Sequence, residues 1–412
     1  MNLVTLITGI VIAMAVLELL LQGMPNLKRD LFYVAMLVAW IGFTSKYYYG
    51  PDIATYAPLY DEIGNLGDFV RGKYPAGYEL GYLAFTSLCK SLGMSYWWMT
   101  AIISTLFFYA VFIVLKELKD KRVLALALVL VIMKDLIYAQ FRQCLAVSFF
   151  IFAIVEAERW KNGGYNRQRN VLGAVVLGLV AMTMHKSGIF MVILTFVYYV
   201  LLRVEMGKNI WSMLLMLLLL FMIVPTWSII EAIIKALDLG TIAMYSVKLH
   251  LSYMRLIQTN LLIYGMVLIV LVIYARKQTG KGMIVASAAA GMIVIVTLYQ
   301  YYYIVDRLRS YFALILIYYA FSVMREASEN KLPFVGLVRQ VCEIVVIFFM
   351  VGKTYSFDNA SSREQGDLLE SCTVFDLLYN DAEAIRKRQL EKADRFWDSD
   401  QRTDSRYEIK NK

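Results

Sequence analysis

The sequence is poor in charged residues. Only 18% of its 412 residues are charged, whereas 60% are hydrophobic, and the mean hydropathy is +0.59. A water-soluble globular domain of this length does not normally have such a composition. The chain is therefore predicted to be an integral membrane protein.

Cysteine and histidine are also scarce, with four cysteines and two histidines in the whole chain. The cysteines are scattered, so neither a disulfide framework nor a metal-binding spacing is visible. The net charge of +9 is typical of positively charged cytoplasmic loops and suits an anionic substrate. We expect no nucleic-acid partner.

Several common enzyme signatures are missing. The sequence has no Gly-rich phosphate loop with GK[ST], no HExxH, no GxSxG and, in its membrane portion, no paired Asp motif that would hold a metal. These absences argue against an ATP-driven pump, a metalloprotease, a serine hydrolase and a metal-dependent glycosyltransferase. We expect neither a metal nor another cofactor.

Long apolar runs are separated by short charged loops. This pattern predicts an all-α polytopic integral membrane protein with about twelve transmembrane helices, because backbone groups in lipid must be hydrogen bonded within each helix. The runs cover residues 3–21, 31–45, 96–115, 122–136, 142–155, 171–184, 187–202, 210–230, 256–275, 283–303, 311–324 and 334–351. The first run is expected to be a retained span and not a signal peptide. Residues 78–92 are predicted to form a re-entrant or surface helix, because the segment is short and charged.

Basic loops set the expected orientation. With the N-terminus outside, the basic clusters between the spans fall on the cytoplasmic side. We predict a transmembrane domain at 1–352, with outer loops at 46–77 and 231–255, and a charged tail at 353–412. The count of spans leaves the tail outside, but its near-neutral charge leaves either side open.

Arg142 stands at the start of an otherwise apolar run, with Gln143 beside it and Tyr138 one turn earlier. A guanidinium group is costly next to lipid, so we expect it to point into the protein or into a watered cavity. We interpret Arg142 as the anion-binding end of an active site. The alternative is an arginine that snorkels to the lipid headgroups.

Other polar residues are predicted to lie with Arg142 on the outer side of the membrane. His185 and Lys186 interrupt two apolar runs, in a turn where an imidazole can titrate near neutral pH. Arg307 and Arg309 lie between two later spans, and forked guanidinium groups suit phosphate oxygens. The plain alternatives are a histidine bonded to a turn carbonyl and an arginine pair at a helix end.

The first outer loop and its flank are rich in Tyr, Asp and Gly, and contain Asp52, Tyr56 and Glu79. Aromatic rings that stack on sugars, together with carboxylates that bind sugar hydroxyls, would produce this composition. An interfacial tyrosine belt would produce it as well. The second outer loop contains Arg255 and is compatible with a lid over the site.

The segments YYYGPDIATY, YELGY, FRQCLA, MHKSGI and DRLRSYF occur in this order. Their order resembles that of the EpsG family of bacterial membrane proteins, which are Wzy-like exopolysaccharide and O-antigen polymerases. The chain departs from the family pattern at its first segment, where Lys46 and Gly50-Pro51-Asp52 replace an Arg and a Gly-Thr-Asp-like sequence. The role of this first cation is therefore open.

The resemblance implies a metal-independent glycosyltransferase of the bacterial cytoplasmic membrane. It would join oligosaccharide repeat units carried on polyprenyl pyrophosphate at the outer face, with membrane lipids, a flippase and a chain-length regulator as partners. The expected catalytic base is His185, Glu79 or Asp52, in that order. The expected substrate-binding residues are Arg142, Gln143, Lys186, Arg307, Arg309, Tyr56, Tyr138 and Arg255.

Two other functions stay open. A glycan ligase would use the same carrier and similar cations and base, and would differ in its acceptor. A glycolipid flippase or transporter would need a polar path through the membrane, where the sequence places few charges, mainly Glu18 and Glu343.

Overall fold

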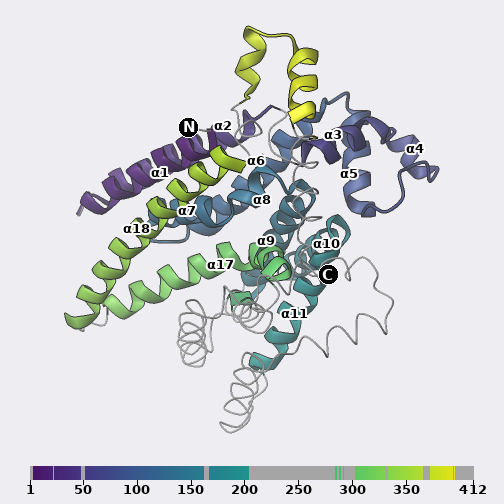
Figure 1. The fold of residues 1–412 in the computed structure, drawn as a ribbon. Helices are drawn as coiled ribbons and strands as arrows, with labels where there is room; N and C mark the ends of the chain where they lie inside the picture. The colour runs from purple at the N-terminus through teal and green to yellow at the C-terminus, as the bar shows by residue number, and fades with distance from the viewer. Residues whose placement is uncertain are drawn as a thin grey trace, which may run out of the picture. The chain divides into compact units, whose positions relative to one another are not determined.

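The computed structural model describes residues 3–21, 23–47, 52–161, 167–203, 284, 287, 288, 291, 302–329, 333–364, 372–392 and 394. In this part of the chain the regular structure is helical (Figure 1), and the extended pairing is a bridge between Lys46 and Thr373. This confirms the predicted all-α class.

The helices agree well with the predicted runs. In chain order they are α1 (Leu3–Leu20), α2 (Pro25–Thr44), α3 (Ile53–Glu62), α4 (Leu66–Val70), α5 (Leu80–Ser91), α6 (Tyr96–Leu115), α7 (Arg122–Ile132), α8 (Lys134–Tyr138), α9 (Phe141–Lys161), α10 (Arg167–Met184), α11 (Lys186–Arg203), α17 (Tyr302–Glu329) and α18 (Pro333–Glu364), followed by the 3-10 helix η1 (Val374–Leu378). Residues 382–392 are also helical. The helix predicted at 78–92 is present as α5.

Several boundaries differ from the prediction, and α17 and α18 extend well beyond the runs predicted at 311–324 and 334–351. The run predicted at 31–45 begins earlier, as α2, because Pro25 at the first helical turn is well suited to starting a helix. The run predicted at 122–136 is divided after Ile132 into α7 and α8. The outer loop predicted at 46–77 contains two short helices, α3 and α4.

Two of the described helices, α1 and α6, are long and apolar enough to cross a membrane on their own. α7 is apolar but shorter. These helices support a helical membrane protein, and the total of about twelve spans stays a prediction. The predicted runs 210–230 and 256–275, the outer loop 231–255 with Arg255, and most of 283–303 lie outside the described residues.

The chain divides into two compact units. The first contains Met1–Phe149, Val180–Lys186 and Ala320–Lys412, and the second contains Phe150–Leu179 and Ser187–Tyr319. In the first unit α1 packs against α2, α7 and α18, and α2 also packs against α6 and α7 (Figure 1). Small residues at these interfaces, including the fully buried Ala15, Ala39 and Ala127, let the helix backbones approach closely.

The C-terminal segment returns to the C-terminal end of α2. Tyr47 N–H donates to the Cys372 carbonyl at 2.9 Å, and Val374 N–H donates to the Ser45 carbonyl at 2.7 Å. Arg386 pairs with Asp61 of α3. Residues 372–392 therefore lie on the same side of the protein as the predicted outer loop 46–77. The domain boundary predicted at 352/353 stays a prediction, and α18 runs unbroken across it.

Candidate functional site

Polar side chains of the first unit converge where several helices begin. Arg142 is the second residue of α9, and Glu79 is the N-cap residue of α5. His185 lies between α10 and α11, and Tyr56 lies on α3. The site is thus built from helix termini, which hold their first residues in a fixed direction.

Arg142 is held by two hydrogen bonds and two aromatic rings. Its Nη1 donates to Oε2 of Glu79 at 2.6 Å, and its Nε donates to the Tyr56 hydroxyl at 3.2 Å. Its Cζ lies 5.5 Å from the ring centroid of Tyr56 and 5.2 Å from that of Tyr78. The side chain therefore points into the protein, as the sequence predicted. Its role in binding an anion stays a prediction.

Glu79 connects Arg142 to the start of α11. Its side chain is 9% exposed, and its Oε1 accepts a hydrogen bond from the Lys186 backbone N–H at 3.3 Å. Burial alone would raise the pKa of Glu79, but the charges of Arg142 and His185 together with hydrogen bonds hold that pKa below its ordinary value. Glu79 is therefore ionised at neutral pH and is a weak proton acceptor.

Gly81 allows α5 to approach the end of α10. A Cβ atom at this position would lie 2.8 Å from the backbone carbonyl carbon of Thr183, closer than real Cβ atoms come. The close approach brings Glu79 within reach of the Lys186 N–H and of the charge of His185. A residue without a side chain is thus needed to assemble the site.

We expect Gly81→Ala to lower the free energy of unfolding by about 1–3 kcal/mol, because the added methyl group must displace backbone. Gly9→Ala is the matched control, since Gly9 lies within α1 and a Cβ there would meet no atom within 4 Å. The control should be neutral or slightly stabilising, because alanine has the higher helix propensity. Thermal unfolding of the two purified variants in detergent compares them. Unchanged stability of Gly81→Ala would contradict the close packing described above.

An aromatic cluster packs around Tyr56, which binds Arg142. The Tyr56 ring lies 6.0 Å from that of Tyr82 and 5.7 Å from that of Phe141, both edge-on. Tyr56 is 6% exposed, and burial raises the pKa of its hydroxyl, which therefore stays neutral. The structure thus gives Tyr56 a role in positioning Arg142, and its predicted contact with substrate stays a prediction.

The remaining predicted residues are placed as follows. Asp52 is the N-cap residue of α3 and lies close enough to Tyr56 to raise the pKa of the tyrosine. Gln143 is buried next to Arg142, and Tyr138 ends α8. Arg307 and Arg309 lie on α17 in the second unit. Arg255 lies outside the described residues.

Lys46, whose role the sequence left open, is a buried residue near the start of α9. Its Nζ donates to the Ile137 carbonyl at 2.6 Å and lies 5.4 Å and 5.6 Å from the ring centroids of Phe43 and Phe141. Burial lowers the pKa of this lysine to about 7. Lys46 thus binds the last turn of α8 and supports the residue that precedes Arg142.

Comparison with known proteins agrees with the resemblance of the motifs. The sequence model of the EpsG family matches residues 30–361, which include every segment that contributes to the site. Searches of the curated proteins and of the solved structures found no match. The chain therefore belongs to the EpsG family and is a membrane protein of polysaccharide biosynthesis.

Proposed function

We propose that this protein polymerises oligosaccharide repeat units carried on polyprenyl pyrophosphate, at the outer face of the bacterial cytoplasmic membrane. The observation that carries the proposal is Arg142, which Glu79 and Tyr56 fix at the N-terminus of α9. A fixed guanidinium group, together with a histidine whose charge acts on the same Glu79 carboxylate, suits the departure of a pyrophosphate. The proposed enzyme has about twelve spans and needs no metal.

In the proposed reaction, a hydroxyl oxygen of one lipid-linked unit attacks the anomeric carbon of the growing chain. The new glycosidic C–O bond forms as the C–O bond to the pyrophosphate breaks. Polyprenyl pyrophosphate leaves with the bonding electron pair, and the hydroxyl proton passes to a base. The enzyme must therefore stabilise growing negative charge at one point and accept a proton at another.

Arg142 is the proposed stabiliser of the leaving group. Its position is already set by Glu79 and Tyr56, so little reorganisation is needed as charge develops, and the positive end of the α9 dipole acts in the same direction. A guanidinium group carries five N–H donors, and these two partners accept from two of its nitrogens. Lys186, Arg307 and Arg309 are proposed as further cations for the pyrophosphate.

His185 is the proposed base. Glu79 was the second candidate, but its ion pair with Arg142 and its lowered pKa make it a poor proton acceptor. Asp52 remains a weaker candidate beside Tyr56. Glu79 instead positions Arg142 and the start of α11, the helix that follows His185.

The flippase alternative is less well supported, because the two carboxylates that the sequence suggested for a polar path, Glu18 and Glu343, hold the start of α7. Oε2 of Glu18 accepts hydrogen bonds from the backbone N–H groups of Val123 and Leu124 at 3.0 Å each. Glu343 pairs with Lys121 at 3.0 Å. Neither group favours a polar path for a sugar through the membrane.

The lipid-linked glycan profile of a deletion strain tests the proposed function. We expect single repeat units on the carrier and no long chains, because units are still made and exported but are not joined. A complemented strain should regain long chains. Full-length polymer that accumulates without attachment to its final acceptor would instead identify a ligase, and repeat units retained on the cytoplasmic side would identify a flippase.

A further inference from the structure

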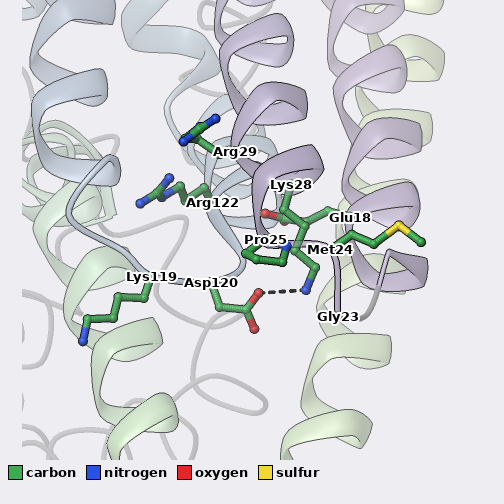
Figure 2. Close-up of a pocket in the computed structure, with 9 residues that line it drawn as sticks. All are labelled: Glu18, Gly23, Met24, Pro25, Lys28, Arg29, Lys119, Asp120 and Arg122. Atoms are coloured by element: carbon green, nitrogen blue, oxygen red, sulfur yellow. Dashed lines mark hydrogen bonds and ion pairs between the residues drawn. The ribbon is translucent and has the colours of Figure 1, made fainter.

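A basic pocket of about 170 Å³ lies where α1 ends and α2 begins (Figure 2). The C-terminal segment meets the other end of α2. The pocket is formed by the α1–α2 turn and by the connection between α6 and α7. Its charged lining residues are Lys28, Arg29, Lys119, Arg122, Glu18 and Asp120. The positive-inside rule places this end of the helices at the cytoplasmic face.

One wall of the pocket is held firmly at the start of α7. Lys121 has a φ of 61° and is the non-glycine residue with a left-handed backbone in the described part of the chain, a conformation that costs about 1–3 kcal/mol. Glu18 offsets this cost by accepting from the Val123 and Leu124 N–H groups, and Glu343 pairs with the Lys121 side chain. Lys121 thus turns toward α18, while its neighbours Asp120 and Arg122 line the pocket.

The cations of the pocket exceed its available carboxylates. Glu18 is only 1% exposed, and its carboxylate accepts hydrogen bonds from the α7 backbone. Asp120 pairs with Lys28 at 3.1 Å (Figure 2). Arg29 has an exposed pair with Asp30, which contributes little in water. An excess of positive charge therefore remains on Arg29, Lys119 and Arg122.

Apolar side chains surround the same turn. Leu20, Met24 and Leu27 are 73%, 54% and 48% exposed, and Met24 itself lines the pocket. In a membrane protein such exposed side chains lie against acyl chains. A cationic pocket next to an apolar rim matches a molecule that has an anionic head and hydrocarbon tails. Inorganic phosphate would use the cationic pocket only.

We propose that this pocket binds the phosphate group of an anionic phospholipid from the cytoplasmic leaflet. The phosphate contacts Arg29, Lys119 and Arg122, and the acyl chains lie along Leu20, Met24 and Leu27. Basic pockets between transmembrane helices are suited to such headgroups. The proposal concerns the opposite end of the helices from Arg142 and does not depend on the reaction proposed above.

Native mass spectrometry of the purified full chain tests this site with phosphatidylglycerol, phosphatidylcholine and inorganic phosphate as probes. We expect phosphatidylglycerol to bind in preference to phosphatidylcholine, and millimolar phosphate not to displace it. The double variant Arg29→Gln/Lys119→Gln should bind phosphatidylglycerol about thirtyfold more weakly, because each of the two cations contributes about 1 kcal/mol near a membrane surface. Both side chains are exposed, so the fold should tolerate the change.

Lys116→Gln is the matched control, because Lys116 lies in the same basic cluster, stacks on Phe112 and does not line the pocket. This control should bind the lipid as the parent chain does. Equal affinity of the double variant and the parent chain would overturn the proposal, as would an equal loss in Lys116→Gln. Displacement of the lipid by inorganic phosphate would identify a phosphate site and overturn the assignment to a phospholipid.

Discussion

Replacement of Arg142 by alanine is expected to abolish long glycan chains and to lower the polymerisation rate of the purified protein by about 10²–10³-fold, the usual cost of losing one preorganised charge stabiliser. Arg142→Lys should also lose most activity, because lysine keeps the charge but cannot hold Glu79 and Tyr56 with a planar fork. A reconstituted assay with lipid-linked repeat units measures both rates.

The same substitution leaves Glu79 as a buried carboxylate without its ion-pair partner, which itself destabilises a protein by about 3–5 kcal/mol. The double variant Arg142→Ala/Glu79→Gln separates the two effects, because it removes the unpaired charge. We expect the double variant to regain thermal stability and to stay inactive. If it makes long chains, Arg142 serves only the packing of the site, and the proposed stabilisation of the leaving group is wrong.

His185→Gln is expected to reduce the rate by about 10²–10⁴-fold, the range of general-base catalysis. Glutamine cannot accept a proton at neutral pH, so the rate should fall. It keeps a hydrogen-bonding side chain, so stability should change little. The rate in the reconstituted assay and the melting temperature together distinguish a chemical role from a structural one.

Glu79→Gln is the comparison for the histidine variant. It should weaken activity less than His185→Gln and should lower stability more, because the Glu79 carboxylate binds both Arg142 and the Lys186 N–H. An inactive Glu79→Gln variant beside a merely slow His185→Gln variant would exchange the two roles. His185 would then position the acceptor or contact the pyrophosphate.

The helices were largely predictable because the residues within and next to each helix set its boundaries. The run predicted at 96–115 coincides with α6 at both ends, since Ser95 and Lys116 bound an uninterrupted apolar stretch. α3 was missed because it contains Pro58, which normally disfavours a helix interior. Burial of Ile53, Tyr56 and Tyr60 outweighs this local preference, and such tertiary effects are not visible in the residues of the segment alone.

The site was predictable in its parts and not in its pairing. The position of Arg142 beside an apolar run was enough to predict that its side chain points inward, without knowing which residue it pairs with. Its bond to Glu79 joins residues 63 positions apart and depends on how closely α5 approaches α10. The sequence therefore suggested two separate chemical roles for a cation and a carboxylate that hold each other in place.

The return of the C-terminal segment to α2 also couples the site to the order of synthesis. Asp61 on α3 pairs with Arg386, 325 residues later, and Ser45 and Tyr47 bond to residues 372–374. The 325-residue separation means that α3 is synthesised long before Arg386 exists, and the later segment must then return to α3. The helix that carries Tyr56 consequently gains this support only after residues 372–386 have been made, so a chain truncated before residue 372 would form its first helices without it.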